Sequence, residues 1–187
     1  MVGLITRASV LTAVALERLV ELHVSKRHAA SSLAKGAREF GQDHYPYMVA
    51  LHVGLLAGSA IEGFRRHRDS PPPHAAKMIA LVALAQGLRW WAVASLGQQW
   101  STRVIVMPGA SRVTRGPYRL MRHPNYAAVV IEGAVLPLAC GAPLTAASFT
   151  LANACLLRKR IACEESALKL LKSAATKEGL NEPDAPR

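Results

Sequence analysis

The sequence predicts an all-α, polytopic integral membrane protein with about five transmembrane helices, of which the last two form a hairpin. Hydrophobic residues make up 51% of its 187 residues, yet its formal net charge is +11. The apolar residues are gathered in long runs and the basic residues lie between them, which is typical of a membrane protein with cationic loops. This distribution argues against a nucleic-acid-binding protein. The length suits one domain, so we expect residues 1–187 to form a single membrane-embedded unit.

Three N-terminal spans are expected within residues 1–96, because a spanning helix needs roughly 20 mostly apolar residues. The first covers about 3–24 and lacks the small-residue cleavage site of a signal peptide. The second covers about 46–64 and ends at a basic cluster. The third covers about 75–96 and follows three consecutive prolines.

The last two spans are expected over 126–140 and 143–157. Only Gly141-Ala142 separates them, so they must form an antiparallel hairpin. A further helix over 158–173 should leave the membrane, and the polar residues 175–187 should form a tail. Residues 97–124 read as an ordered interfacial loop, with a short strand near residues 104–107.

Lys and Arg counts predict the orientation. The loops 25–45 and 97–124 and the C-terminal tail would share one side, and this side carries the excess of basic residues. By the positive-inside rule it faces the cytoplasm, in the inner or plasma membrane, with the N-terminus outside.

Polar residues are concentrated immediately before the fourth span, in the segment Gly116-Pro117-Tyr118-Arg119-Leu120-Met121-Arg122-His123-Pro124-Asn125-Tyr126. Proline in the first turn of a helix and the free backbone amides beside it favour an anion site. His123 and the two tyrosines add donors and stacking faces, so the segment suits a ligand with an adenine ring and a carboxylate. The alternative is an aromatic belt at the membrane interface.

A second group of charged residues follows the hairpin. Arg160 and Glu164 are spaced i and i+4, so they share one helix face, with Glu165 beside them. The carboxylate could hold an ammonium group and the arginine an anion. The alternative is a solvated surface ion pair.

Charged residues also occur inside the predicted spans, where they are costly and need partners. We expect Arg89 to pair with Glu17 or Glu21, and Glu132 to be a further carboxylate of the pocket. No metal site is expected, because the spacing of the three cysteines fits no common zinc pattern.

The polar segments together resemble the isoprenylcysteine carboxyl methyltransferase family. The resemblance lies in Gly116-Pro117-Tyr118, in Arg122-His123-Pro124-Asn125-Tyr126 and, after the hairpin, in Arg160-Ile161-Ala162-Cys163-Glu164-Glu165. It covers roughly residues 100 to 172, and the first half of the chain looks like the small bacterial members. The resemblance implies an integral membrane enzyme that takes a methyl group from S-adenosylmethionine and releases S-adenosylhomocysteine.

The resemblance also implies which residues form the site. Arg160 would face the substrate and act in catalysis together with Glu164. Arg103 corresponds by spacing to a cofactor-contacting glutamine of eukaryotic members, which is a departure from the family pattern. The cofactor-binding residues implied by the resemblance are Arg103, Ala110, Ser111, Arg112, Val113, Tyr118, His123, Pro124, Asn125, Tyr126 and Glu164.

The acceptor is expected to be a lipophilic small molecule that arrives from the membrane lipid. Two classes stay open: the carboxylate of a prenylcysteine-like substrate and the hydroxyl of an alkylresorcinol or alkylpyrone. Two other functions compete with methyl transfer. One is an NADPH-dependent reductase of the sterol type, which also carries an Arg-His-x-Asn-Tyr segment, and the other is a non-enzymatic membrane scaffold.

Overall fold

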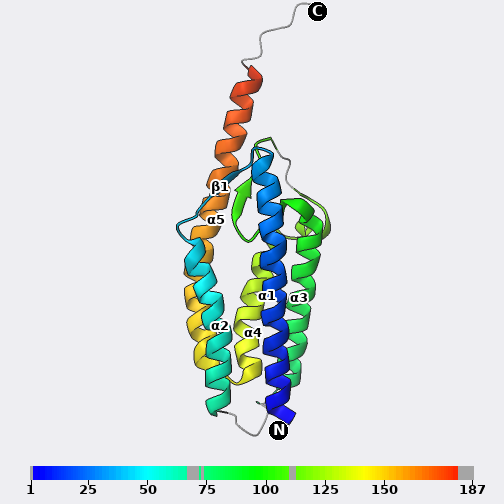
Figure 1. The fold of residues 1–187 in the computed structure, drawn as a ribbon, viewed down its shortest axis with the longest axis vertical. Coiled ribbons are helices and arrows are strands. Elements are labelled where there is room, and N and C mark those ends of the chain that lie inside the picture. The colour runs from blue at the N-terminus through cyan, green and yellow to red at the C-terminus, as the bar shows by residue number, and fades with distance from the viewer. Residues whose placement is uncertain (1, 67–71, 73, 110–112, 181–187) are drawn as a thin grey trace, which may run out of the picture.

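The computed structural model describes residues 2–66, 72, 74–109 and 113–180, and these form a bundle of α-helices with a small sheet at one end (Figure 1). The α-helices are α1 (Val2–Ala34), α2 (Tyr45–Arg66), α3 (Ala75–Leu96), α4 (Pro124–Cys140) and α5 (Pro143–Leu180). The shorter elements are β1 (Arg38–Phe40), β2 (Val104–Val106) and two turns of 3-10 helix, η1 (Gly97–Gln99) and η2 (Gly116–Arg119).

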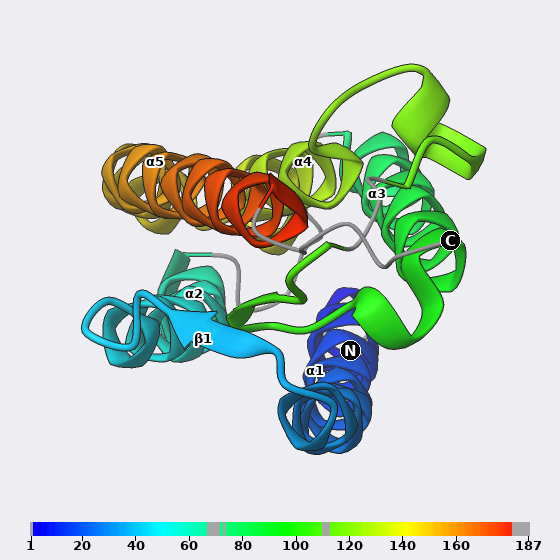
Figure 2. The same ribbon diagram turned by 90° about the horizontal axis from the view of Figure 1, so that it is seen from above.

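The helices stand side by side, with α4 between α3 and α5, and α1 and α2 on the opposite side (Figure 2). Helix α4 also packs against α2, so it is the central element of the bundle. The strands pair antiparallel, with Glu39 of β1 opposite Ile105 of β2. They bring the segment after α1 and the segment after α3 to the same end of the bundle, close to α5.

Helix α4 is bounded by two local signals. Pro124 stands at its first position, where the missing amide costs nothing, and Gly141 ends it with a φ of 78°. A left-handed residue here lets the chain reverse at once into α5. The predicted hairpin is therefore confirmed, and it returns the chain to the end of the bundle at which α4 begins.

Two predicted helices are longer in the structure. α1 continues to Ala34, ten residues beyond the predicted end. Residues 25–34 combine polar side chains with alanines and a leucine that favour a helix, but they form no continuous apolar run. The expected arm 143–157 and the expected helix 158–173 are one continuous helix of 38 residues. This helix also takes up the first residues of the predicted tail, whereas 181–187 lie outside the described residues.

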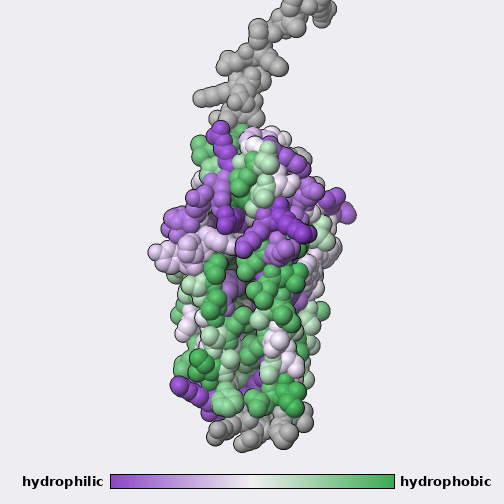
Figure 3. Space-filling model, viewed as in Figure 1, coloured by the Kyte–Doolittle hydropathy of each residue, from purple (hydrophilic) through white to green (hydrophobic). Residues whose placement is uncertain are grey.

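The outer surface of the bundle is apolar over most of its length (Figure 3). On the face shown in Figure 3, polar side chains form a band at the end that carries β1 and β2. Among the described helices, α2 and α3 are long and apolar enough to cross a membrane, and α4 is apolar but shorter.

Four charged side chains form a buried network between α1, α3 and α4. Glu21 accepts hydrogen bonds from Arg18 and from Arg89, whose Nη2 lies 2.7 Å from Oε2 of Glu21. Arg18 also bonds to Glu132 on α4. The predicted pair of Arg89 with Glu21 is confirmed, whereas Glu17 accepts from a glutamine side chain of α3. Glu132 is absent from the walls of both cavities described below, so its expected place in the pocket is wrong.

Helices α2 and α4 approach each other closely at Gly63. A Cβ atom there would overlap the carbonyl oxygen of Cys140 at a separation that no real side chain tolerates. We therefore expect Gly63→Ala to lower the free energy of unfolding by about 1–3 kcal/mol, the usual cost of overpacking. Equilibrium unfolding of the detergent-purified protein measures this change.

Gly54 on the same helix provides the matched control. Among the described residues, no heavy atom outside its own helix lies within 4 Å of the position that an added Cβ atom would occupy. Gly54→Ala should leave stability unchanged or slightly raised, because alanine is the better helix former. Equal losses in the two variants would contradict the close approach of α2 and α4.

Candidate functional site

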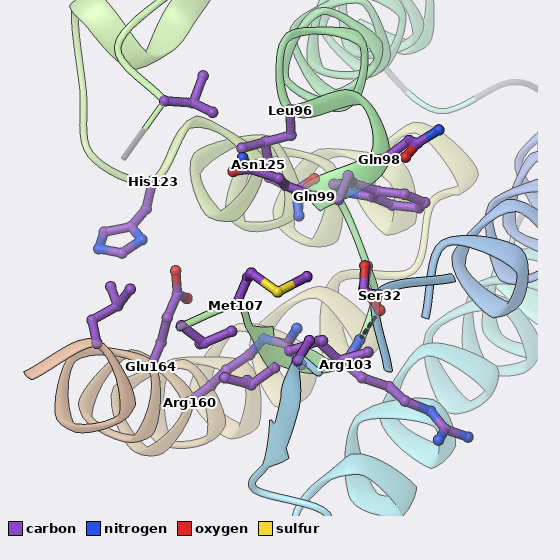
Figure 4. A pocket seen from close by; sticks show the side chains of 18 of the residues that line it. Ser32, Leu96, Gln98, Gln99, Arg103, Met107, His123, Asn125, Arg160 and Glu164 are labelled. Carbon is purple, nitrogen blue, oxygen red and sulfur yellow. Dashed lines mark hydrogen bonds between the residues drawn. The ribbon is translucent and has the colours of Figure 1, made fainter. Parts of the chain in front are cut away.

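Two cavities lie between the helices at the end that carries the sheet. The first, which we call the polar cavity, has a volume of about 520 Å³ and is lined by the segments 96–107 and 118–126 and by one face of α5. His123 and Glu164 point toward each other across it, and Arg160 and Arg103 lie on the wall opposite Leu96 (Figure 4).

The second, which we call the apolar cavity, has a volume of about 290 Å³ and lies between α1, α2, α4 and α5. Leu19 of α1 and Val53 of α2 line it, and they are 63% and 61% exposed on the outer surface. The apolar cavity therefore opens sideways through the apolar surface of the bundle. A lipophilic molecule could reach it without leaving a bilayer.

The two cavities meet at four shared residues, which we call the junction: Trp100, Asn125, Tyr126 and Arg160. Tyr126 lies in the first turn of α4, and Arg160 lies a similar number of residues beyond the hairpin turn on α5. Because the hairpin arms are antiparallel, this spacing places the two side chains at the same height.

The hydroxyl of Tyr126 is the centre of a hydrogen-bond chain at the junction. Nε of Arg160 donates to it over 3.0 Å, and it donates to Oε2 of Glu164 over 2.6 Å. Arg160 is buried and held further by the carbonyl oxygen of Thr102, 2.7 Å from Nη2, and by Sδ of Met48, 3.2 Å from Nη1. The guanidinium group is thus fixed in place before any ligand binds.

Three aromatic side chains of the motif segment, those of Tyr118, His123 and Tyr126, shape the polar cavity. The ring of His123 stacks on the ring of Tyr126, with centroids 5.2 Å apart and planes 8° apart. Burial, together with the negative charge of Glu164, raises the pKa of Tyr118 to about 12. Tyr118 is therefore a neutral phenol at physiological pH and can donate a hydrogen bond into the cavity.

Two buried polar atoms at the junction have no hydrogen-bond partner among the described residues. One is the indole Nε1 of Trp100, a donor, and the other is Oδ1 of Asn125, an acceptor. Buried polar groups are nearly always paired, so atoms such as these mark a place where a ligand supplies the partner. The junction thus offers both a donor and an acceptor to a bound molecule.

Most of the expected site residues line the polar cavity. Those that line it are Arg103, Val113, Tyr118, His123, Asn125, Tyr126, Arg160 and Glu164. Pro124 is buried at the start of α4 and shapes the helix rather than the cavity wall. Ala110, Ser111 and Arg112 lie outside the described residues.

Arg103 is turned partly away from the cavity. Its guanidinium group bonds to Glu39 of β1, with Nη1 3.3 Å from Oε2, and lies 5.2 Å from the ring centroid of Tyr45. The arginine at this position therefore forms an ion pair that links the segment of β2 to β1 beside the cavity.

Sequence reasoning missed several lining residues. Ser32 belongs to the extension of α1, and Lys35 follows the end of that helix. Gln99 ends η1, the short turn after α3, and Trp100 follows it. The Gln99-Trp100 pair carried a usable signal, since it places an amide and an aromatic ring at the end of an apolar helix. This is the same signature that singled out His123-Pro124.

Comparison with known proteins identifies the family. The model of the isoprenylcysteine carboxyl methyltransferase (ICMT) family matches residues 78–170, the stretch that contains α3, α4 and much of α5. An uncharacterized protein of Bacillus subtilis, YpbQ, is 36% identical over 154 residues, which cover 82% of this chain and 91% of that protein.

An uncharacterized protein of Haemophilus influenzae is 25% identical over 155 residues, which cover 82% of this chain and 90% of that protein. The stretch matched by the family model includes both the His123 segment and the Arg160 to Glu164 turn, so it covers both of the motif segments. The chain belongs to the isoprenylcysteine carboxyl methyltransferase family.

Proposed function

We propose that the protein is an S-adenosylmethionine-dependent O-methyltransferase that methylates a lipophilic acceptor at the membrane. The observation that carries this proposal is the meeting of a polar cavity with an apolar, laterally open cavity at Tyr126 and Arg160. A water-soluble cofactor and a lipid-like acceptor can approach each other there from different phases. Family membership supports the methyl-transfer chemistry.

The residues of the polar cavity fit S-adenosylmethionine. One carboxylate oxygen of Glu164 accepts the hydrogen bond from Tyr126, and the other could accept one from the ammonium group of the cofactor. Glu165 also lines the cavity, next to Glu164. The rings of His123 and Tyr118 offer stacking and hydrogen-bonding surfaces to an adenine ring. The unpartnered atoms of Trp100 and Asn125 belong to residues that line both cavities, so they lie between the cofactor side and the acceptor side.

The bound cofactor supplies an electrophilic methyl group on a positively charged sulfur. The contribution of the protein is alignment, since an in-line displacement depends on holding acceptor and methyl group at the right distance and angle. Arg160 is fixed by Tyr126 and Thr102 and would orient a negatively charged acceptor oxygen by charge-assisted hydrogen bonds.

The two acceptor classes place different demands on the junction. A carboxylate is already the nucleophile and needs only Arg160 to orient it. A phenolic or enolic hydroxyl must lose a proton, and Oε2 of Glu164 lies at the end of the hydrogen-bond chain from Tyr126. The same residues can therefore serve either class.

We further propose that the whole bundle lies in the membrane, so that α1, α4 and the first part of α5 cross it together with α2 and α3. The apolar outer surface and the buried charge network of α1 support this arrangement (Figure 3). The end with the polar band and the excess of basic residues would face the cytoplasm. S-adenosylmethionine is then available to the polar cavity from the cytosol.

Cofactor binding tests the proposal directly. Calorimetry on the purified protein should show binding of S-adenosylhomocysteine and none of NADPH. Glu164→Gln should weaken that binding by about tenfold, since it removes a charged partner of the ammonium group. Glu62→Gln removes the same charge outside both cavities and should leave the affinity unchanged.

Binding of NADPH alone would instead indicate a reductase. Binding of neither compound would support a non-enzymatic scaffold.

The lateral opening of the apolar cavity gives a second test. Val53→Trp should fill the cavity from its exposed rim, so that the acceptor loses its apolar contacts there. We expect the rate of label transfer from S-adenosylmethionine to extracted membrane lipid to fall about tenfold or more. The affinity for S-adenosylhomocysteine should not change, since Val53 does not line the polar cavity.

Ile61→Trp is the matched control, because Ile61 is 55% exposed on the same helix and lies outside the apolar cavity. A similar loss of transfer in both variants would rule out the sideways route between α1 and α2.

A further inference from the structure

The apolar cavity contains a ring of polar side chains below the junction. We call this ring the polar collar; it consists of Arg18, His52, Arg89 and Asn153. Asn153 lies two turns before Arg160 on α5, which at 1.5 Å per residue is about 10 Å along the helix. The collar is therefore separate from the residues that would hold the reacting groups, and no step of methyl transfer uses it.

Arg89 is the best-defined member of the collar. It is 5% exposed, and its Nε and Nη2 are both engaged by Glu21. Its Nη1 is buried and has no hydrogen-bond partner among the described residues. A buried guanidinium N–H without an acceptor is costly in a protein interior, so a molecule in the cavity that supplies an acceptor would gain a charge-assisted hydrogen bond.

The charges around the collar determine which acceptor it favours. Arg18 and Arg89 are already balanced by Glu21 and Glu132, to which they bond directly. A further anion would bring an uncompensated charge into an apolar cavity, which is unfavourable. A neutral oxygen would satisfy the free N–H of Arg89 without that cost.

The remaining members of the collar agree with a neutral oxygen. Nδ1 of His52 lies 2.8 Å from the carbonyl oxygen of Met48 and donates to it, so Nε2 of the neutral ring is an acceptor. Asn153 is 3% exposed, and its amide can both donate and accept. A carbonyl or hydroxyl oxygen can be satisfied by such a mixed set, whereas an unbroken alkyl chain would leave it unpaired.

We propose that the polar collar is a second recognition point for the methyl acceptor, and that it binds a neutral oxygen roughly 6–10 Å from the oxygen that receives the methyl group, one to two helical turns along the bundle. This inference rests on the proposed function, because it assigns the apolar cavity to the acceptor. It limits the acceptor class to lipophilic molecules that carry two oxygen functions rather than one.

The test compares two phenols that differ in one oxygen. 4-Dodecanoylphenol carries a carbonyl group across the ring from its hydroxyl, and 4-dodecylphenol lacks that carbonyl group. Each is titrated against the full-length protein in lipid nanodiscs, saturated with S-adenosylhomocysteine, and binding is followed by tryptophan fluorescence. We expect the ketone to bind about tenfold more tightly, as one hydrogen bond to a charged donor provides.

The informative variant replaces Glu21 and Arg89 together, as Glu21→Met with Arg89→Met. Removing both members of a buried ion pair leaves no uncompensated charge, and Arg18 keeps its bond to Glu132. The ratio of the two affinities should fall to about one in this variant, so that the ketone loses its advantage over 4-dodecylphenol. The affinity for S-adenosylhomocysteine should stay the same, because neither residue lines the polar cavity. Asp43→Met with Lys159→Met removes an ion pair at the surface and should retain the preference for the ketone.

Three results would overturn the inference: equal affinity of the wild-type protein for the two phenols, a preference that survives the Glu21 and Arg89 substitutions, or binding of S-adenosylhomocysteine but of neither phenol. These results would leave the proposed cofactor chemistry intact. If the wild-type protein fails to bind S-adenosylhomocysteine, the proposed function is wrong, and the assignment of the collar to the acceptor is then wrong as well.

Discussion

The hydroxyl of Tyr126 holds the two halves of the site together. It accepts from Arg160 and donates to Glu164, so one oxygen atom links the first turn of α4 to two successive turns of α5. The ring of the same residue forms part of both cavity walls and carries the stacked ring of His123. Every role assigned to these side chains depends on the hairpin that brings the start of α4 and the middle of α5 to one height.

The buried ion network has a comparable role for the rest of the bundle. Arg18 and Glu21 tie α1 to α3 and α4, although α1 is otherwise at the edge of the helix arrangement (Figure 2). Charges inside an apolar environment are stable only when paired, so the network specifies how α1 must be placed. That placement leaves the apolar cavity between α1 and α2, and its opening on the outer surface follows from it.

The sequence predicted the hairpin, and it singled out motif residues that the structure gathers around the polar cavity, because both depend on local signals. Pro124 and Gly141 mark the ends of α4, and the spacing of Arg160 and Glu164 fixes their common face. The extension of α1 was not predicted from apolar runs, since more than half of residues 25–34 are polar. The place of Trp100 at the junction depends on contacts between distant segments, which a single sequence does not reveal.

Transfer of a labelled methyl group to a membrane lipid tests the central claim most directly. Membranes that contain the protein are incubated with labelled S-adenosylmethionine, the lipids are extracted, and the labelled species are identified by mass spectrometry. The account predicts a lipophilic product with its methyl group on oxygen, strongly reduced in Tyr126→Phe, which removes the link between Arg160 and Glu164. Label that is absent from the lipid fraction, or equal in the wild-type protein and Tyr126→Phe, would contradict it.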